Sequence, residues 1–254
     1  QERPWPLLPM VVSEAICGYG EKALPAAAAF QFLLAAGDVF DDIQDADSPD
    51  SIYAKYGLAI AISVASTLLI LGERSLTRRR PTSIDAGTLI RTSDVINSFY
   101  TRACIGQHLD ITAEAHLSEQ QYLEIIAMKS AAQIECSCYT GALLAGANQE
   151  LIDAFASFGH NSGMVFQIGN DIQGIISGKD IIKGKITLPA IYALTMTDNK
   201  IRNELMPVFQ KQNIPVRDFQ PAKELLFHAG ALHYATLKME VYKQRALDIL
   251  SGIQ

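Results

Sequence analysis

The chain has 254 residues, with 21 lysines and arginines against 27 aspartates and glutamates, giving a formal net charge of −6. This acidic balance argues against a nucleic-acid partner, because phosphate backbones are bound by an excess of positive charge. Hydrophobic residues make up 49% of the chain and charged residues 19%, which excludes a disordered protein and predicts a single globular domain over residues 1–254.

In the N-terminal half, an apolar run over residues 26–36 leads into an acidic segment, and a second apolar run covers residues 58–71. The second run is 14 residues long, short of the roughly 20 needed to cross a bilayer, so we expect a core helix there and no membrane span. No basic segment followed by an apolar one opens the chain, so nothing indicates export and we expect a cytoplasmic protein.

Farther along the chain, apolar residues recur at helical spacing over residues 122–126 and 151–158. Ser118 and Gln121 have the spacing of a capping box before the first of these runs. Strand-like alternation is nearly absent, so we predict an all-α protein. Glycine, proline and polar residues cluster where we expect loops between helices: residues 18–20, 48–49, 78–81, 146–148, 178–185 and 213–215.

The acidic segment places aspartates at positions 38, 41, 42, 45 and 47. On a helix, the first four are related by three, four and seven residues, so their carboxylates point to one side. Their mutual repulsion destabilises the helix unless cations neutralise it. One or two carboxylates, completed by water and substrate phosphates, are typical of a magnesium site. The alternative is a solvated acidic helix end.

A second group of polar residues follows in the C-terminal half. Asn170 and Asp171 interrupt an apolar helical run, and Lys179, Lys183 and Lys185 follow in the next segment. Metal ions that bridge acidic side chains to phosphate oxygens, with lysines neutralising the remaining charge, suit a diphosphate ligand. The two acidic helices and the lysines together therefore predict a diphosphate site.

Five segments in chain order resemble motifs of the trans-isoprenyl diphosphate synthases, the polyprenyl synthetase family. They are Asp41-Asp42-Ile-Gln-Asp45 (DDxxD), Gly106-Gln-His-Leu-Asp110 (GQxxD), Lys129-Ser130 (Lys-Thr), Phe166-Gln167 (FQ) and Gly184-Lys-Ile-Thr-Leu-Pro189 (GKxTLP). The resemblance implies an isoprenoid synthase helical bundle around a deep central pocket, commonly as a homodimer. It also implies that an allylic prenyl diphosphate is bound through three magnesium ions and ionised at its C–O bond, after which the carbocation reacts.

The resemblance assigns roles to individual residues of this chain. The implied metal ligands are Asp41, Asp45, Asn170 and Asp171, with Asp42 beside the first two. The implied substrate contacts are Lys129, Gln167, Lys179 and Lys185, with Gln107 and Asp110 at the mouth of the pocket. The residues implied to act in the ionisation step are Asp41, Asp42, Asp45, Lys129 and Lys185, because fixed cations stabilise the charge that develops on the departing diphosphate.

Two departures from the family pattern concern the second substrate, isopentenyl diphosphate. Chain-elongating members hold it with a Gly-Lys-Arg segment near the N-terminus and with arginines after the first aspartate motif. Here the N-terminal segment offers Arg3 preceded by Glu2, and Asp47-Ser-Pro-Asp50 occupies the place of the arginines. Negative charge where an anion would bind lowers its affinity, so we expect a damaged isopentenyl site.

A third departure concerns the second aspartate motif, which reads Asn170-Asp171-Ile-Gln-Gly174. This pattern resembles the metal triad of class I terpene cyclases, but Gly178 stands where that triad ends in glutamate. We therefore expect fewer protein ligands and weaker binding of one metal ion.

We accordingly interpret the sequence as a magnesium-dependent enzyme that ionises an allylic prenyl diphosphate and lacks a normal isopentenyl site. It would act as a terpene cyclase or as a prenyltransferase with another acceptor, such as the tryptophan of a pheromone peptide. The resemblance also implies that product length is limited by bulky residues four and five positions before the first aspartate. Gly37 and Ala36 stand at these positions, which implies room for a chain of about C15 to C20. The alternatives are a chain-elongating synthase and a non-catalytic subunit that regulates such a synthase.

Overall fold

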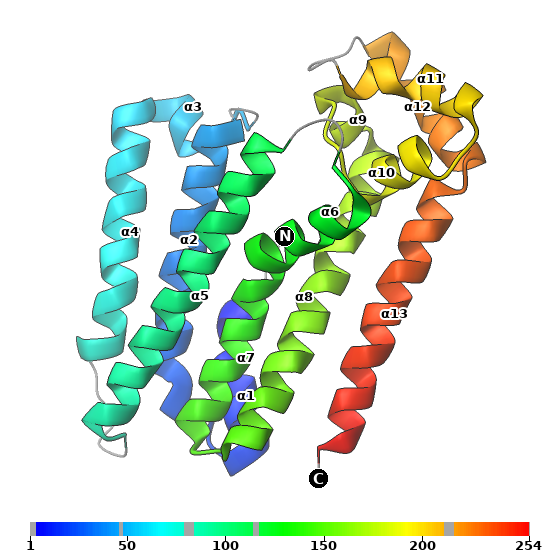
Figure 1. The fold of residues 1–254 in the computed structure, drawn as a ribbon. Coiled ribbons are helices and arrows are strands. Elements are labelled where there is room, and N and C mark those ends of the chain that lie inside the picture. The colour runs from blue at the N-terminus through cyan, green and yellow to red at the C-terminus, as the bar shows by residue number, and fades with distance from the viewer. Residues whose placement is uncertain (1–3, 46–47, 79–83, 114–116, 211–215, 254) are drawn as a thin grey trace. The chain divides into compact units, whose positions relative to one another are not determined.

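The computed structural model describes residues 4–45, 48–78, 84–113, 117–210 and 216–253. Every regular element in these ranges is a helix, which confirms the predicted all-α class (Figure 1). The chain divides into two compact units. Unit 1 contains Gln1–Phe99 and Ile134–Ala156, and unit 2 contains Tyr100–Gln133 and Ser157–Gln254. The single domain over residues 1–254 therefore stays a prediction.

Unit 1 is built around α2, whose apolar face is buried. Its elements are η1 (Trp5–Leu7), α1 (Leu8–Cys17), η2 (Gly20–Ala23), α2 (Leu24–Asp45), α3 (Ile52–Tyr56), α4 (Leu58–Arg78), most of α7 (Ala132–Ala145) and parts of α5 (Ala86–Thr112) and α8 (Gln149–Ser177). Ala26, Ala29, Phe30, Leu33 and Ala36 of α2 are almost completely buried. Their spacing of three and four residues places them on one face of the helix, so the following aspartates are carried on a well-packed helix.

Helix α4 contains the second apolar run, but the expectation of a core helix is wrong. The large apolar residues Leu58, Ile60, Ile62, Leu69 and Ile70 are 37% to 60% exposed. A helix that is apolar on several sides buries only the side that contacts its neighbours. Here that side carries Ala61, Ala65 and Leu76.

Two segments of unit 1 have the length and composition of a membrane-crossing helix. They are Gly20–Asp45, in which the apolar stretch of 18 residues is 50% buried inside the protein, and Leu58–Thr77, in which the corresponding stretch is 17% buried. Buried core helices and helices that pack against another protein share this composition. The absence of a membrane span therefore stays a prediction.

Unit 2 contains the predicted helix with its capping box. Its elements are α6 (Glu119–Ile126), the π-helical turn Ala127–Ala131, α9 (Lys179–Lys183), α10 (Leu188–Thr195), α11 (Asn199–Phe209), α12 (Val216–His228), α13 (Ala231–Gly252) and parts of α5 and α8. The Gln121 N–H donates to Ser118 Oγ and the Ser118 N–H donates to Gln121 Oε1, at 3.3 and 3.0 Å. Tyr122 and Ile126 are buried against Ile168 of α8, so α6 is fixed both at its start and along its face.

The expected loops are partly correct. Residues 146–148 do separate α7 from α8, whereas residues 178–185 contain the short helix α9. Positive φ angles of 83° at Gly178 and 68° at Gly184 bound this helix on both sides, and glycine adopts this conformation without steric cost. The breaks expected at residues 79–81 and 213–215 lie outside the described residues.

The π-helical turn Ala127–Ala131, which carries Lys129 and Ser130, is packed closely by two glycines. A Cβ at Gly106 of α5 would lie 2.9 Å from Lys129 Cα, and a Cβ at Gly163 of α8 would lie 2.5 Å from Ala131 Cα. Neither position has room for a side chain, so the three backbones approach one another directly. The glycine of the Gly106-Gln107 segment is thus explained by packing.

We expect Gly163→Ala to destabilise the protein by about 1–3 kcal/mol, because its methyl group can be accommodated only if the backbones separate. The matched control is Gly169→Ala on the same helix, where a Cβ would meet only Met239 Sδ at 3.7 Å. That substitution should stabilise by about 0.4–1 kcal/mol through the unfolded state. Urea unfolding measures both, and equal effects of the two substitutions would contradict the close approach at Gly163.

A polar cluster joins α6 to α13. Glu119 accepts hydrogen bonds from Tyr234 Oη at 2.5 Å and from Lys238 Nζ at 2.7 Å, and the Tyr234 ring stacks on Tyr192 at a centroid distance of 4.3 Å. Burial raises the pKa of Glu119, but these hydrogen bonds from Lys238 and Tyr234 outweigh it and lower the pKa below its ordinary value of 4.5.

A lowered pKa in the folded state means that ionised Glu119 stabilises the fold above pH 4.5 and that this contribution is lost as the pH falls below 4.5. On acidification, the wild-type protein should lose more free energy of unfolding than Glu119→Gln does. We expect the difference to be about 1 kcal/mol or less. Glu124→Gln, which removes an exposed carboxylate from the same helix α6, is the control for the loss of one charge. Urea unfolding at a series of pH values between 3 and 6 measures the difference, and parallel curves for all three proteins would contradict it.

Candidate active site

The first aspartate motif lies in unit 1, in the last two turns of α2. Asp45 is exposed, and Asp41 and Asp42 are partly buried. Asp41 and Asp45 are four residues apart and share one side of the helix. Carboxylates at a helix C-terminus are disfavoured by the helix dipole as well as by each other. A bound cation would offset both of these energetic costs. Asp47, at the end of the acidic segment, lies outside the described residues.

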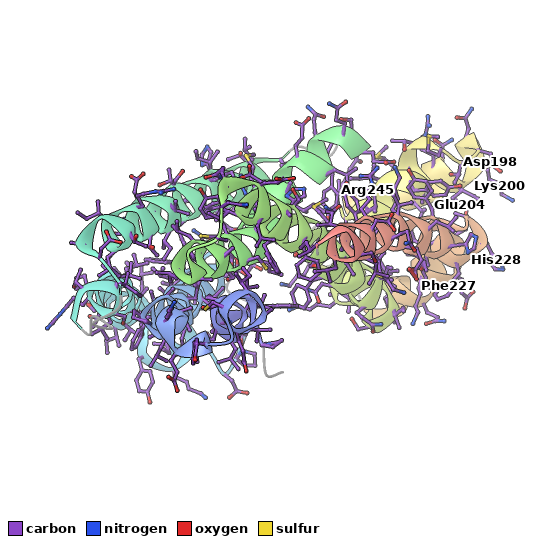
Figure 2. All side chains as sticks on the ribbon, turned by 90° about the horizontal axis from the view of Figure 1, so that it is seen from below. Asp198, Lys200, Glu204, Phe227, His228 and Arg245 are labelled. Atoms are coloured by element: carbon purple, nitrogen blue, oxygen red, sulfur yellow. The ribbon has the colours of Figure 1, made fainter. Side chains whose placement is uncertain are left out.

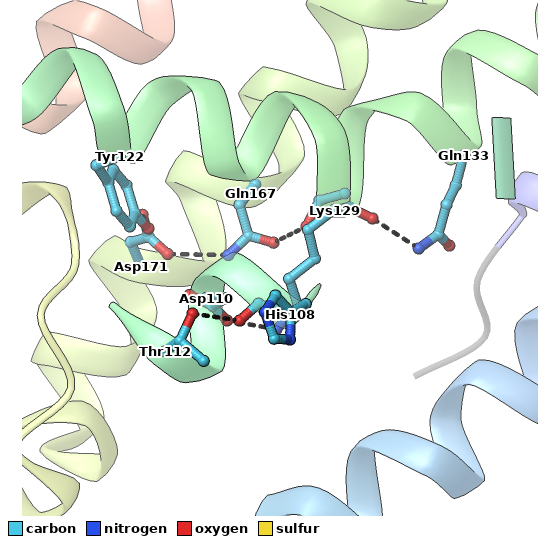
Figure 3. A network of polar contacts seen from close by, with 9 residues as sticks. His108, Asp110, Thr112, Tyr122, Lys129, Gln133, Gln167 and Asp171 are labelled. Atoms are coloured by element: carbon cyan, nitrogen blue, oxygen red, sulfur yellow. Dashed lines mark hydrogen bonds and ion pairs between the residues drawn. The ribbon is translucent and has the colours of Figure 1, made fainter. Parts of the chain in front are cut away.

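Unit 2 brings two predicted substrate contacts together in an ion pair. Lys129 Nζ, from the π-helical turn, lies 2.6 Å from Asp110 Oδ2 at the end of α5 (Figure 3). The two side chains are 22% and 20% exposed, so the ion pair is largely shielded from water. Gln107, one helical turn before Asp110, is partly buried on the same helix.

A chain of hydrogen bonds extends from the same turn into α8 (Figure 3). Ser130 Oγ donates to Gln167 Oε1 at 2.8 Å, and Gln167 Nε2 donates to Asp171 Oδ1 at 3.0 Å. Tyr122 Oη of α6 donates to Asp171 Oδ2 at 2.5 Å. These bonds fix the orientation of the Gln167 amide and leave one of its N–H groups to reach a ligand.

Asp171, predicted as a metal ligand, lies at the centre of this network. The residue is 2% exposed, and burial raises the pKa of its carboxyl group to about 7, while the bonds from Tyr122 and Gln167 work in the opposite direction. In this structure both carboxylate oxygens of Asp171 accept hydrogen bonds, one from Gln167 and one from Tyr122. The neighbouring Asn170 is exposed. A ligand role for Asp171 stays a prediction.

Two of the predicted lysines, Lys179 and Lys185, lie near a carboxylate that sequence reasoning missed. Burial raises the pKa of Asp180, and the charges of Lys185 and Lys179 lower it, so both ammonium groups are near. Lys185 is partly buried and Lys179 is exposed. No motif identifies Asp180. Its sequence signal was a single acidic residue between lysines, and such a residue is common on protein surfaces.

The donor set fits magnesium that is bound together with a diphosphate. Among the described residues, no three histidine, cysteine, aspartate or glutamate side chains gather into a complete metal site. Magnesium usually takes only one or two carboxylates and completes its octahedron with water and phosphate oxygens. Asp41 and Asp45, one helical turn apart at the end of α2, are such a pair of carboxylates.

The helical fold and these motif side chains define the class of protein. The family model described as Polyprenyl synthetase matches residues 5–226, and the chain belongs to this family. The geranylgeranyl diphosphate synthase of Sulfolobus acidocaldarius is 30% identical, over 98% of this chain and 79% of that protein. The tryptophan prenyltransferase ComQ of Bacillus subtilis is 26% identical, over 89% of this chain and 74% of that protein.

Solved structures give the same result for the fold. The geranylgeranyl pyrophosphate synthetase of the archaeon Geoglobus acetivorans superposes with a TM-score of 0.90 at 26% identity, covering 100% of this chain and 82% of that one. The geranylgeranyl pyrophosphate synthetase of Pyrococcus horikoshii also gives 0.90 at 26% identity, covering 98% and 79%. The isoprenoid synthase fold is thus confirmed, and its central pocket stays a prediction.

Proposed function

We propose that this protein is a magnesium-dependent trans-prenyl diphosphate synthase that extends an allylic prenyl diphosphate with isopentenyl diphosphate. The observation that carries the proposal is the family match over residues 5–226, together with the relative named geranylgeranyl diphosphate synthase that covers 98% of the chain. These findings support the chain-elongating alternative better than the cyclase or the transfer to another acceptor that the sequence favoured.

The residues on α2 and α8 would hold the metal-bound diphosphate. In unit 1, Asp41 and Asp45, with Asp42 beside them, would be ligands of magnesium. In unit 2, Asn170 would be a ligand of magnesium. Magnesium would supply a Lewis acid that stabilises the charge on the departing diphosphate. Three ions are implied by the resemblance and remain part of the proposal.

The cationic residues of unit 2 would bind and stabilise the leaving group. Lys129 is oriented by its ion pair with Asp110, and Lys185 is partly buried beside Asp180. An ammonium group held in place before the reaction costs no reorganisation when negative charge develops. Gln167 would donate its remaining N–H, and Gln107 and Lys179 would contribute at the edge of the site.

The residues before the first motif support a product of about C20. Ala36 is completely buried and Gly37 is exposed, so neither contributes a bulky side chain on α2. A C15 substrate extended by one unit gives a C20 product, which agrees with the relatives named geranylgeranyl diphosphate synthase.

A second candidate function is prenyl transfer to an acceptor other than isopentenyl diphosphate, such as a peptide. Two observations favour it. Asp50, in the place of an arginine segment, is 90% exposed at its side chain and pairs with Lys55 at 3.0 Å. The relative ComQ is named a tryptophan prenyltransferase. Arg3, Glu2 and Asp47, which the same argument uses, lie outside the described residues.

The test is incubation with C10, C15 or C20 allylic diphosphate and magnesium, with and without isopentenyl diphosphate. Longer diphosphates formed only when isopentenyl diphosphate is present would support elongation. A hydrocarbon or alcohol formed without it would instead establish a cyclase. Diphosphate release that needs a tryptophan-containing peptide would establish the second candidate. If no diphosphate is released under any of these conditions, the remaining alternative is a non-catalytic subunit that regulates such a synthase.

The exposed apolar residues of α4 support a homodimer as the form in solution. Leu58, Ile60, Ile62 and Ile70 would be removed from water by a second copy of the chain. We expect light scattering to give twice the mass of the chain, and Ile62→Lys to shift the protein towards monomer. Leu250→Lys, which changes an exposed apolar residue of α13, is the control. A monomeric wild-type protein would contradict the dimer.

A further inference from the structure

In the altered second aspartate motif, a carboxylate from the neighbouring helix α9 lies where the side chain of a final aspartate would be. Gly174 is the position at which the resemblance calls for the final aspartate of DDxxD. A Cβ built at Gly174 would overlap Cγ and Oδ2 of Asp180 and lie 2.8 Å from its Oδ1. The carboxylate of Asp180, which begins α9, therefore occupies the space into which a side chain at position 174 would extend.

Helix geometry places this carboxylate beside the remaining ligand of the motif. Positions 170 and 174 are one turn apart on α8 and share a face, with their Cβ positions about 5–6 Å apart. Asn170 is exposed on that face. The same carboxylate is close enough to Asp171 for its negative charge to raise the pKa of Asp171, so it reaches the centre of the motif.

We propose that Asp180 replaces the missing aspartate of the second motif and, together with Asn170, holds the magnesium ion on this side of the diphosphate. The inference rests on the proposed function, because it concerns the same metal-bound diphosphate. Asp180 holds the ion either directly or through a metal-bound water, since magnesium keeps several waters in protein sites. The loss of the aspartate at 174 is thus compensated from a different helix.

A purely structural role for Asp180 makes the opposite prediction. If Asp180 only pairs with Lys185 and Lys179, its removal would free positive charge and strengthen the binding of an anion. If Asp180 holds a cation, its removal weakens metal binding. The sign of the change therefore separates the two roles.

The experiment measures metal binding directly, without turnover. Free Mn²⁺ is followed by electron paramagnetic resonance as the full-length protein is titrated in the presence of inorganic diphosphate. We expect Asp180→Asn to bind at least one Mn²⁺ about 10- to 100-fold more weakly than the wild-type protein. The control is Glu204→Gln, which removes one carboxylate from the exposed outer surface of α11 and should bind as the wild type does (Figure 2).

A relocation variant keeps the test valid if the loss of Asp180 disturbs α9. In Gly174→Asp/Asp180→Ala the carboxylate is returned to α8, and the space that Asp180 occupied is vacated. We expect this variant to recover Mn²⁺ binding to within about threefold of the wild type, whereas Asp180→Ala alone remains weak.

The outcomes separate this inference from the proposed function. Wild-type binding that Asp180→Asn leaves unchanged or strengthens would overturn the role of Asp180 and leave the proposed function intact. Weak binding in the relocation variant, with circular dichroism showing a native fold, would also overturn it. A wild-type protein that binds no Mn²⁺ with diphosphate would overturn both.

Discussion

Asp41→Ala and Asp45→Ala are each expected to abolish turnover while the fold remains intact. Each substitution removes a proposed metal ligand from the end of α2, and the loss of several kcal/mol of charge stabilisation corresponds to a rate at least about 10³-fold lower. The helix should still form, because its buried face lies earlier, at Ala26 to Ala36, and the substitutions reduce the repulsion between carboxylates. Released diphosphate measures the rate and circular dichroism measures the fold.

The control for this prediction is Asp38→Ala, one turn earlier on the same helix and outside the DDxxD motif. Asp38 is exposed, as Asp45 is, so the variant loses the same charge from a similar surface. We expect it to retain activity within about threefold of the wild type. Full activity in Asp41→Ala or Asp45→Ala would exclude the metal assignment.

Lys185→Ala is expected to lower kcat by about 10²- to 10³-fold, the usual cost of removing one group that stabilises developing negative charge. The effect on KM should be smaller, because the charge of the leaving group is greatest in the transition state. Lys185→Arg should recover part of the rate, since it restores a positive charge with different geometry. Single-turnover measurement of diphosphate release separates this step from product dissociation.

Lys200→Ala is the matched control, because Lys200 is an exposed lysine of the same unit at the start of α11 (Figure 2). It has the same charge but lies on none of the elements that carry the motifs. We expect its kcat to equal that of the wild type. If Lys185→Ala behaved in the same way, another cation, such as Lys129, would have to stabilise the leaving group.

Local sequence patterns predicted the helices well, because the capping and the buried face of a helix depend on residues three or four positions apart in the chain. The capping box of Ser118 and Gln121 is present in the structure, and the apolar positions Tyr122, Ile125 and Ile126 are buried as their spacing indicates. The family was also recognisable from the sequence, because its motifs are short and carry unusual charge.

The sequence could not reveal features that depend on distant contacts. Periodicity does not say whether an apolar helix is covered, which is why α4 was mistaken for a core helix. Asp180 lies six positions after Gly174 and on another helix, so the proximity of the two residues appears only when the turn at Gly178 is known. Gln167 was expected to contact substrate, and its partners Ser130 and Asp171 were not expected.

The π-helical turn Ala127–Ala131 has a consequence for insertions and deletions. Such a turn contains one residue more than an α-helical turn of the same rise. Deleting any one of its residues would allow a regular α-helix but would rotate all of α7 by about 100°. Cys136, Cys138 and Ala142, now buried, would leave their face of the helix. The number of residues in this turn is therefore fixed by the packing of α7 even at positions whose side chains could vary.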